Sequence, residues 1–271
     1  MLRWLKSLQG RQTLRPRRIP DALWQGTLDN FPFLSDPGEP GAPALKSLVR
    51  LFLQQKEFYG AAGLQITDEM AIAIAAQACR PVLHLERPYR GLQWYDDFVG
   101  IVVHPDAMLA RRETTDDAGV VHHYQEVVTG EAMQDGPVTL SWRDVQDAGH
   151  SAHSGYNVVI HEFVHKIDMR DGSADGCPPL PDGFMGASTV AQARRLWVAT
   201  LQTQHEEFCD KLSIAERFGG AQPWLDPYAA HSIDEFFAVV CEAYFVNPGF
   251  LARDFAALVP MFDAFFKQAP G

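Results

Sequence analysis

Apolar residues in the first third of the chain recur at helical spacing. Leu45–Phe58 places leucine and phenylalanine side chains on one face and predicts a helix that is ended by the glycines after it. A second helix is predicted to begin at Thr67 and to continue through Met70–Cys79, where nearly every residue is apolar, until a proline stops it. A helix with that composition is expected to be buried. The Pro- and Gly-rich residues 31–43 predict a loop ahead of both helices.

The pattern changes to that of strands between Trp94 and Trp142 and then returns to helices. Three segments, Phe98–His104, Val120–Val128 and Pro137–Trp142, are rich in β-branched and aromatic residues and are separated by turn-forming linkers. An α+β fold with a small mixed sheet and a mainly helical remainder is therefore expected. The later segments are predicted, in order, as a connector at 141–147 and helices at 157–168, 189–212, 233–245 and 251–266.

The apolar segment Asn157–Asp168 carries the strongest chemical pattern in the chain. It contains His161-Glu162-x-x-His165, the His-Glu-x-x-His pattern of zinc peptidases. Two histidines four residues apart project from one helix face, so both imidazoles can bind one metal ion. Glu162 is placed to take a proton from a water that the metal activates. A core helix with two solvated or capping histidines is the alternative interpretation.

A catalytic zinc needs a third protein ligand and one open coordination position. Glu235 is the preferred candidate, because Glu235 and Glu242 lie two turns apart on one face of an otherwise apolar segment. Glu242 is then expected to orient a zinc-binding histidine, and a solvated acidic stripe is the alternative. Asp168 and His231 are the other candidate ligands, since Asp168 follows His165 by three residues and His231 precedes Glu235 by four.

The net charge of −11 is unevenly distributed along the chain. Residues 1–20 contain basic side chains and no acidic one, which predicts a basic N-terminal tail ahead of a single domain at 21–271. The leucines of this tail also allow a short amphipathic turn that contacts a membrane surface or a partner. The acidic remainder argues against nucleic acid as the main partner.

Membrane insertion and disulfide bonds are both unexpected from the sequence. No stretch approaches the roughly 18 apolar residues that a membrane span requires, so stable insertion is not predicted. The cysteines, Cys79, Cys177, Cys209 and Cys241, are widely spaced and form no Cys-x-x-Cys pair. They are predicted to be reduced, mostly buried thiols of a cytoplasmic protein.

Several segments together form a longer pattern than His-Glu-x-x-His alone. These are Thr67–Met70, Ala75–Pro81, Gln125–Met133, Gly136–Trp142, Gly155–Asp168 and the pair Tyr228 and Glu235. In this combination the chain resembles the Mlc titration factor A family of zinc peptidases over most of residues 20–265. Over a shorter region it is similar to the catalytic domain of anthrax lethal factor, in which a tyrosine also precedes the glutamate ligand.

The resemblance implies a zincin-like fold and a set of site residues. By position, His161, His165 and Glu235 would bind zinc, Glu162 would be the general base and Tyr228 the active-site tyrosine. It also implies aminopeptidase-type activity in the cytoplasm. A regulatory role is implied as well, in which the protein binds the repressor Mlc and relieves repression of the sugar phosphotransferase system.

Two functions are therefore open at this point. In the first, a metallopeptidase binds a peptide or protein substrate as an extended strand against the sheet edge Val138–Trp142, and Tyr228 donates to the oxyanion. In the second, a non-enzymatic protein with a structural zinc site sequesters a transcription regulator. The presence of Glu162 favours the enzyme, because a structural zinc site does not need a base.

Overall fold

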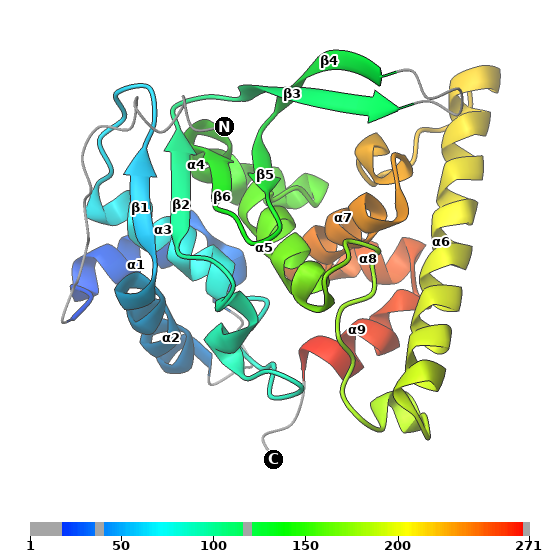
Figure 1. Cartoon of the computed structure of the whole chain (residues 1–271), viewed down its shortest axis with the longest axis horizontal. Coiled ribbons are helices and arrows are strands. Elements are labelled where there is room, and N and C mark those ends of the chain that lie inside the picture. Colours follow the sequence, from blue (N-terminus) through cyan, green and yellow to red (C-terminus); the bar gives the residue numbers. More distant parts are fainter. Residues whose placement is uncertain (1–17, 36–40, 116–120, 268–271) are drawn as a thin grey trace.

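The computed structural model describes residues 18–35, 41–115 and 121–267 and contains both helices and strands (Figure 1). Helices predominate, and a small sheet lies among them. In chain order the elements are α1 (Asp21–Asn30), η2 (Pro32–Leu34), α2 (Gly41–Gln55), β1 (Glu57–Gly60), α3 (Asp68–Cys79), η3 (Gly91–Tyr95), β2 (Gly100–His104), β3 (Met108–Thr115), β4 (Val121–Val128), β5 (Gly130–Ala132), β6 (Val138–Ser141), α4 (Trp142–Ser151), η4 (Ala152–Ser154), α5 (Val158–Asp168), η5 (Met169–Asp171), η6 (Phe184–Gly186), α6 (Val190–Phe218), η7 (Pro227–Ala230), α7 (Ile233–Val246), α8 (Pro248–Asp254) and α9 (Leu258–Phe266).

The main sheet is mixed and has the strand order β1-β2-β6-β5. The first three of these strands are parallel, and β5 runs antiparallel to β6 with Gly130 opposite Leu140. Strands β3 and β4 form a separate antiparallel ribbon that crosses the top of Figure 1 toward α6. The prediction that Val138–Trp142 forms the sheet edge is therefore wrong. Residues 130–132 pair with β6 on its outer side, so β5 is the edge strand.

Helix α5 lies in the middle of the fold between the sheet and α7 (Figure 1). Its buried side is held by Phe163, whose ring packs against those of Tyr95, Phe52 and Phe98 at centroid distances of 5.0, 5.7 and 5.9 Å. The nearly all-apolar helix α3 also packs against α5, and its residues 70–79 are buried as expected. These contacts fix the helix that carries His161 and His165 against the core.

Five of the described α-helices, α3, α4, α5, α6 and α7, begin at a polar side chain that caps the first turn. Thr67, Asn157 and Ser232 each accept a hydrogen bond from the backbone N–H three residues later, at 3.3, 2.9 and 3.5 Å. Asn157 also donates through Nδ2 to Gln77 Oε1 at 2.8 Å, which joins the start of α5 to α3. The predicted starts of the second helix and of the His-Glu-x-x-His helix are confirmed.

Other boundaries differ from the prediction. The helix expected at Leu45–Phe58 begins at Gly41 and ends at Gln55, and residues 57–60 form β1, which pairs in parallel with β2. The connector at 141–147 is instead the start of α4, which Ser141 caps. The helix expected at 251–266 is two helices, α8 and α9, and the helix expected at 189–212 continues to Phe218.

The structure also bears on the cysteines, the tail and the membrane. All four cysteines are free, with Cys209 half-buried and the other three buried. In the part of the chain that is described, no helix combines the length and the apolarity that crossing a bilayer requires. Of the predicted basic tail, residues 1–17 lie outside the described residues.

Candidate metal centre

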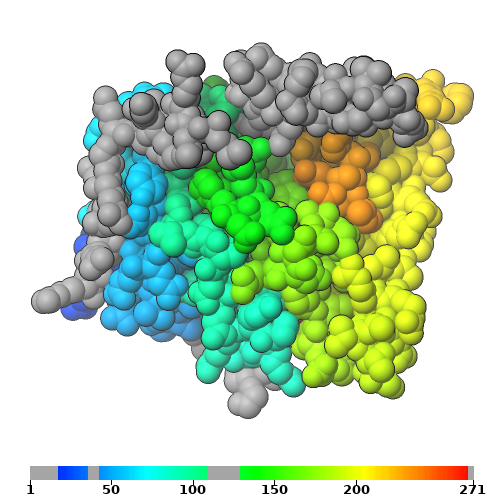
Figure 2. Space-filling view, in the orientation of Figure 1, coloured from blue at the N-terminus to red at the C-terminus, as the bar shows by residue number. Residues whose placement is uncertain are grey.

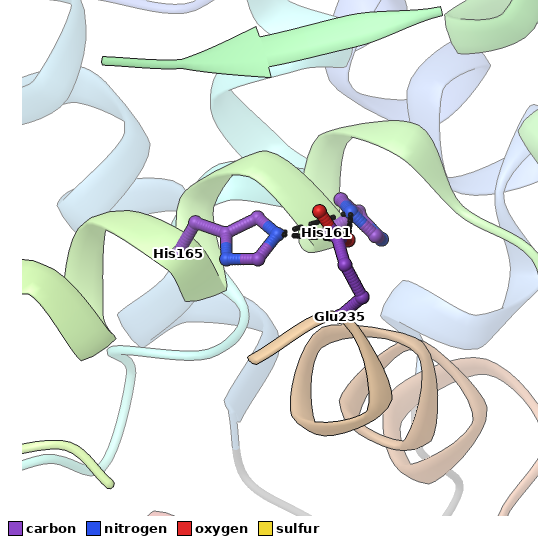
Figure 3. A group of neighbouring side chains, drawn as sticks. All are labelled: His161, His165 and Glu235. Carbon is purple, nitrogen blue, oxygen red and sulfur yellow. Dashed lines mark hydrogen bonds and ion pairs between the residues drawn. The ribbon is translucent and has the colours of Figure 1, made fainter. Parts of the chain in front are cut away.

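Two histidines from α5 and one glutamate from α7 point toward one another between these helices (Figure 3). Glu235 Oε2 lies 3.0 Å from His161 Nε2 and 3.3 Å from His165 Nε2, and the two Nε2 atoms are 3.1 Å apart. Within residues 18–35, 41–115 and 121–267, this is the group of histidine, cysteine and carboxylate side chains whose donor atoms are close enough to hold one metal ion.

The donor chemistry of this group fits a divalent metal. His161 Nδ1 lies 2.8 Å from Glu242 Oε1, so Nδ1 donates to Glu242 and His161 Nε2 faces Glu235. Without a metal, a proton on Nε2 bridges to Glu235, and a metal ion bound to Nε2 and Glu235 would take the place of that proton. A tetrahedral zinc with bonds of about 2.0–2.1 Å holds its ligand atoms about 3.3 Å apart, close to the spacing seen here.

The electrostatics of the group also favour a bound cation. Burial opposes a charge on Glu235, but the hydrogen bonds from His161 and His165 outweigh it and hold the pKa of Glu235 below its usual range. Burial also opposes a charge on His161, yet the contacts with Glu235 and Glu242 raise its pKa well above the usual value. Positive charge is thus strongly favoured between these donor atoms.

Glu242 connects the two helices that carry the group. One carboxylate oxygen accepts from His161 Nδ1, and the other accepts from the backbone N–H of Asn157, the capping residue of α5. The side chain of Glu242 is fully buried, and burial raises its pKa despite the hydrogen bonds that it accepts. The carboxylate therefore sets the tautomer and the ring orientation of His161.

Replacing Glu242 with glutamine is expected to weaken metal binding without unfolding the protein. The amide has the same shape but no charge, so it supports the His161 Nδ1–H less strongly, and loss of such a partner typically costs about 10–100-fold in metal affinity. Zinc titration against a competing chelator measures the change. Glu69→Gln, an exposed position in the first turn of α3, is the matched control. Equal zinc affinity in the Glu242 and Glu69 variants would contradict the positioning role.

Glu162 lies beside the metal group at the wall of a pocket of about 440 Å³. Its side chain is buried, and burial raises its pKa to about 7, so the carboxylate can exchange a proton near neutral pH. Residues 129–132 line the pocket on one side. Tyr228 of η7 and residues of α7 line it as well. In Figure 2 the green segment around β5 and the orange segment around η7 lie close together on the visible face.

The two other candidate ligands lie elsewhere in the structure. Asp168 is fully buried, and its Oδ2 accepts from the backbone N–H of Gly176 at 2.8 Å, so it holds the loop that follows α5. His231 stacks on the ring of Tyr228 with a centroid distance of 5.7 Å. Neither residue belongs to the group formed by His161, His165 and Glu235, as far as the described residues extend.

Tyr228 reaches the metal group from η7. Its hydroxyl donates to Glu235 Oε1 at 3.2 Å, and its ring lies 6.1 Å from that of His161. The backbone N–H of Tyr228 donates to Asp226 Oδ1, which caps η7 and fixes the turn. Trp224, four residues before Tyr228, stacks on Phe250.

Comparison with known proteins identifies the family. Residues 4–267 match the family described as glucose-regulated metallo-peptidase M90. The chain belongs to this M90 family. Proteins named Mlc titration factor A, from Yersinia pestis (strain Pestoides F) and Yersinia pseudotuberculosis (serotype O:1b, strain IP 31758), are each 32% identical to it over 271 residues. The match covers 100% of this chain and 91% of each relative.

The family assignment confirms the expectation drawn from the sequence segments. The observed α+β fold, with a small mixed sheet and a mainly helical remainder, is also as expected and is consistent with a zincin-like metallo-peptidase family. Sequence reasoning on this M90 protein missed the edge strand β5 and its contact with Glu162. Gly130 lies after the predicted strand Val120–Val128, so no strand pattern in the sequence would make the glycine stand out.

Proposed function

We propose that this M90 protein is a zinc-dependent peptidase of the aminopeptidase type. The observation that supports this most is the convergence of His161, His165 and Glu235 beside the buried carboxylate of Glu162. A structural zinc site is closed by four protein ligands and needs no base, whereas a catalytic site has three ligands and an open position. Three donors at the wall of a pocket, with a carboxylate next to them, match the catalytic arrangement.

Each residue of the site has its own role in the proposed hydrolysis. Zinc held by the three donors would lower the pKa of a water molecule and polarise the scissile carbonyl. Glu162 would take a proton from the attacking water and pass it to the leaving amine. The hydroxyl of Tyr228 donates to the oxygen on which negative charge develops. Strand β5 lies at the edge of the sheet formed by the described residues, and an extended peptide would pair with the backbone of this strand.

The acidic lining supports a substrate with a free amino terminus. Asp226 and Asp234 line the pocket in addition to the carboxylates of the metal group, and the described lining residues include no lysine or arginine. A carboxylate-lined pocket favours a positively charged group such as the α-ammonium of a peptide. This is the feature of the pocket that favours aminopeptidase-type cleavage over cleavage within a chain.

A peptide-library assay tests the proposed function. Purified protein is stripped of metal with a chelator, reconstituted with one equivalent of zinc, and incubated with a peptide mixture whose products are sequenced by mass spectrometry. We expect removal of N-terminal residues only after zinc is restored. Absence of cleavage with full zinc occupancy would contradict the enzyme assignment, and products cut internally would contradict the aminopeptidase type.

Replacing Tyr228 with phenylalanine is expected to lower kcat with little effect on folding or zinc content. The phenol of tyrosine is neutral at pH 7 and donates well to an oxyanion, and loss of one such donor typically costs about 10²–10³-fold in kcat. Steady-state kinetics with zinc occupancy verified measure this. Phenylalanine keeps the ring that stacks on His231, so an unchanged kcat would assign Tyr228 to packing alone.

A regulatory role can coexist with catalysis. The relatives are named Mlc titration factor A, and we propose that this chain binds an Mlc-like transcriptional repressor in the cytoplasm. Isothermal titration of the purified chain with such a repressor, with and without zinc, tests this second role. Saturable binding that survives Glu162→Gln would assign repressor binding to a surface that does not depend on the catalytic base.

A further inference from the structure

Gly130, on the edge strand β5, lies directly against the side chain of Glu162. A Cβ atom on Gly130 would come 2.3 Å from Glu162 Oε1, 2.6 Å from Cγ and 2.7 Å from Cδ. Carbon–carbon contacts between non-bonded atoms have their optimum near 3.5–4.0 Å, so alanine does not fit beside the present position of the carboxylate. The φ angle of Gly130 is not in the left-handed region, so its backbone conformation is open to any residue. Glycine is needed at residue 130 only because a side chain there would clash with Glu162.

The strand that carries Gly130 is tied to the segment that carries Glu162 at both ends. Before the strand, Thr129 Oγ1 lies 2.8 Å from the hydroxyl of Tyr156, just ahead of α5. After the strand, the carbonyl oxygen of Met133 accepts from Lys166 Nζ at 3.0 Å, and Lys166 lies on α5 itself. Pairing with β6 holds the strand on its other side. A side chain added at residue 130 would therefore displace the carboxylate of Glu162, which is the flexible partner, and leave the strand in place.

We propose that Gly130 is a positioning residue that sets where the carboxylate of Glu162 lies relative to the metal group. This inference rests on the proposed function, in which Glu162 is the general base. The missing side chain lets the edge strand and α5 approach closely, so the carboxylate of Glu162 lies directly against the strand. Confinement of this kind keeps a general base within hydrogen-bond reach of the water that it deprotonates.

Gly130→Ala is expected to lower kcat about 10²-fold, the order of loss that a displacement of about 1 Å can cause. Zinc affinity should change little, because the three atoms nearest to a Cβ on Gly130 all belong to Glu162, which is not a metal donor. Gly100→Ala is the matched control in the same sheet. A Cβ on Gly100 meets Pro137 Cβ at 3.5 Å and Tyr59 at 3.8 Å, which are ordinary contacts, so this variant should keep wild-type kcat.

A double-mutant cycle on thermal unfolding of the metal-free protein provides a test that does not depend on activity. Gly130→Ala should lower Tm by about 2–5 °C when Glu162 is present, because overpacking is destabilising. In a Glu162→Ala background the clash is removed, so the same substitution should change Tm by less than about 1 °C, and this non-additivity marks direct contact.

The two measurements separate the possible failures. An additive cycle, in which Gly130→Ala costs the same in both backgrounds, would overturn the positioning role even if the wild-type protein is an active peptidase. If the cycle is non-additive but the protein cleaves no peptide, Gly130 and Glu162 are in contact, but Gly130 has no role in catalysis. Full activity of Gly130→Ala with zinc bound would overturn the inference outright.

Discussion

Replacing Glu162 with glutamine is expected to lower the rate of peptide hydrolysis strongly while leaving zinc bound. Glutamine preserves the size of the side chain next to Gly130 but cannot accept a proton, so only the base is lost. General acid–base catalysis contributes about 10²–10⁴-fold, and we expect a loss of kcat in that range with little change in KM. Zinc content measured on the same preparation should stay at about one per chain, since Glu162 is not among the three donors.

The control for this result is the substitution Glu69→Gln, which makes the same chemical change at an exposed position on α3. It should retain wild-type turnover. If Glu162→Gln also retained wild-type turnover, with zinc verified, the water would have to be activated by another group, and the proposed mechanism would be wrong.

Loss of any one of His161, His165 and Glu235 is expected to remove tight zinc binding and, with it, activity. Each supplies one of three donor atoms that lie 3.0–3.3 Å apart, and two remaining ligands cannot hold a catalytic zinc at the affinity of three. Zinc titration of alanine variants against a chelator should therefore give three large losses of similar size. Far-UV circular dichroism on each variant checks that α5 and α7 remain folded.

Asp168→Ala and His231→Ala are the comparison variants for this series. Asp168 holds Gly176 and His231 stacks on Tyr228, so each acts on the site only through a neighbour. Their effect on zinc affinity should stay within the roughly 10–100-fold range of residues that support a ligand. A ranking in which either variant binds zinc more weakly than Glu235→Ala would overturn the assignment of the third ligand.

The parts of the fold that were predictable from the sequence are those with strong local signals. The starts of α3 and α5 are marked by capping residues, and the 3.6-residue pattern of α5 places His161 and His165 on one face without any tertiary information. Glu235 could be predicted as the third ligand because a carboxylate in an otherwise apolar helix requires a partner. In the structure it lies in the first turn of α7, opposite the two histidines.

The edge of the sheet was not predictable, because strand pairing is decided by contacts distant in sequence. β1 and β5 contain only four and three residues, too few to show a strand period, and β5 is recognised as an edge only from its pairing with β6. For the same reason the contact between Gly130 and Glu162 could not be seen in the sequence. Gly130 and Glu162 lie on different elements, and no local pattern relates them.

The central claim, that His161, His165 and Glu235 hold a catalytic zinc, is tested most directly by anomalous X-ray diffraction. Crystals of the zinc-reconstituted protein would be measured on both sides of the zinc absorption edge. We predict a single anomalous peak about 2.0–2.2 Å from His161 Nε2, His165 Nε2 and a carboxylate oxygen of Glu235, with one coordination position facing the pocket. A peak at any other group of residues, or a fourth protein ligand closing the site, would contradict the claim.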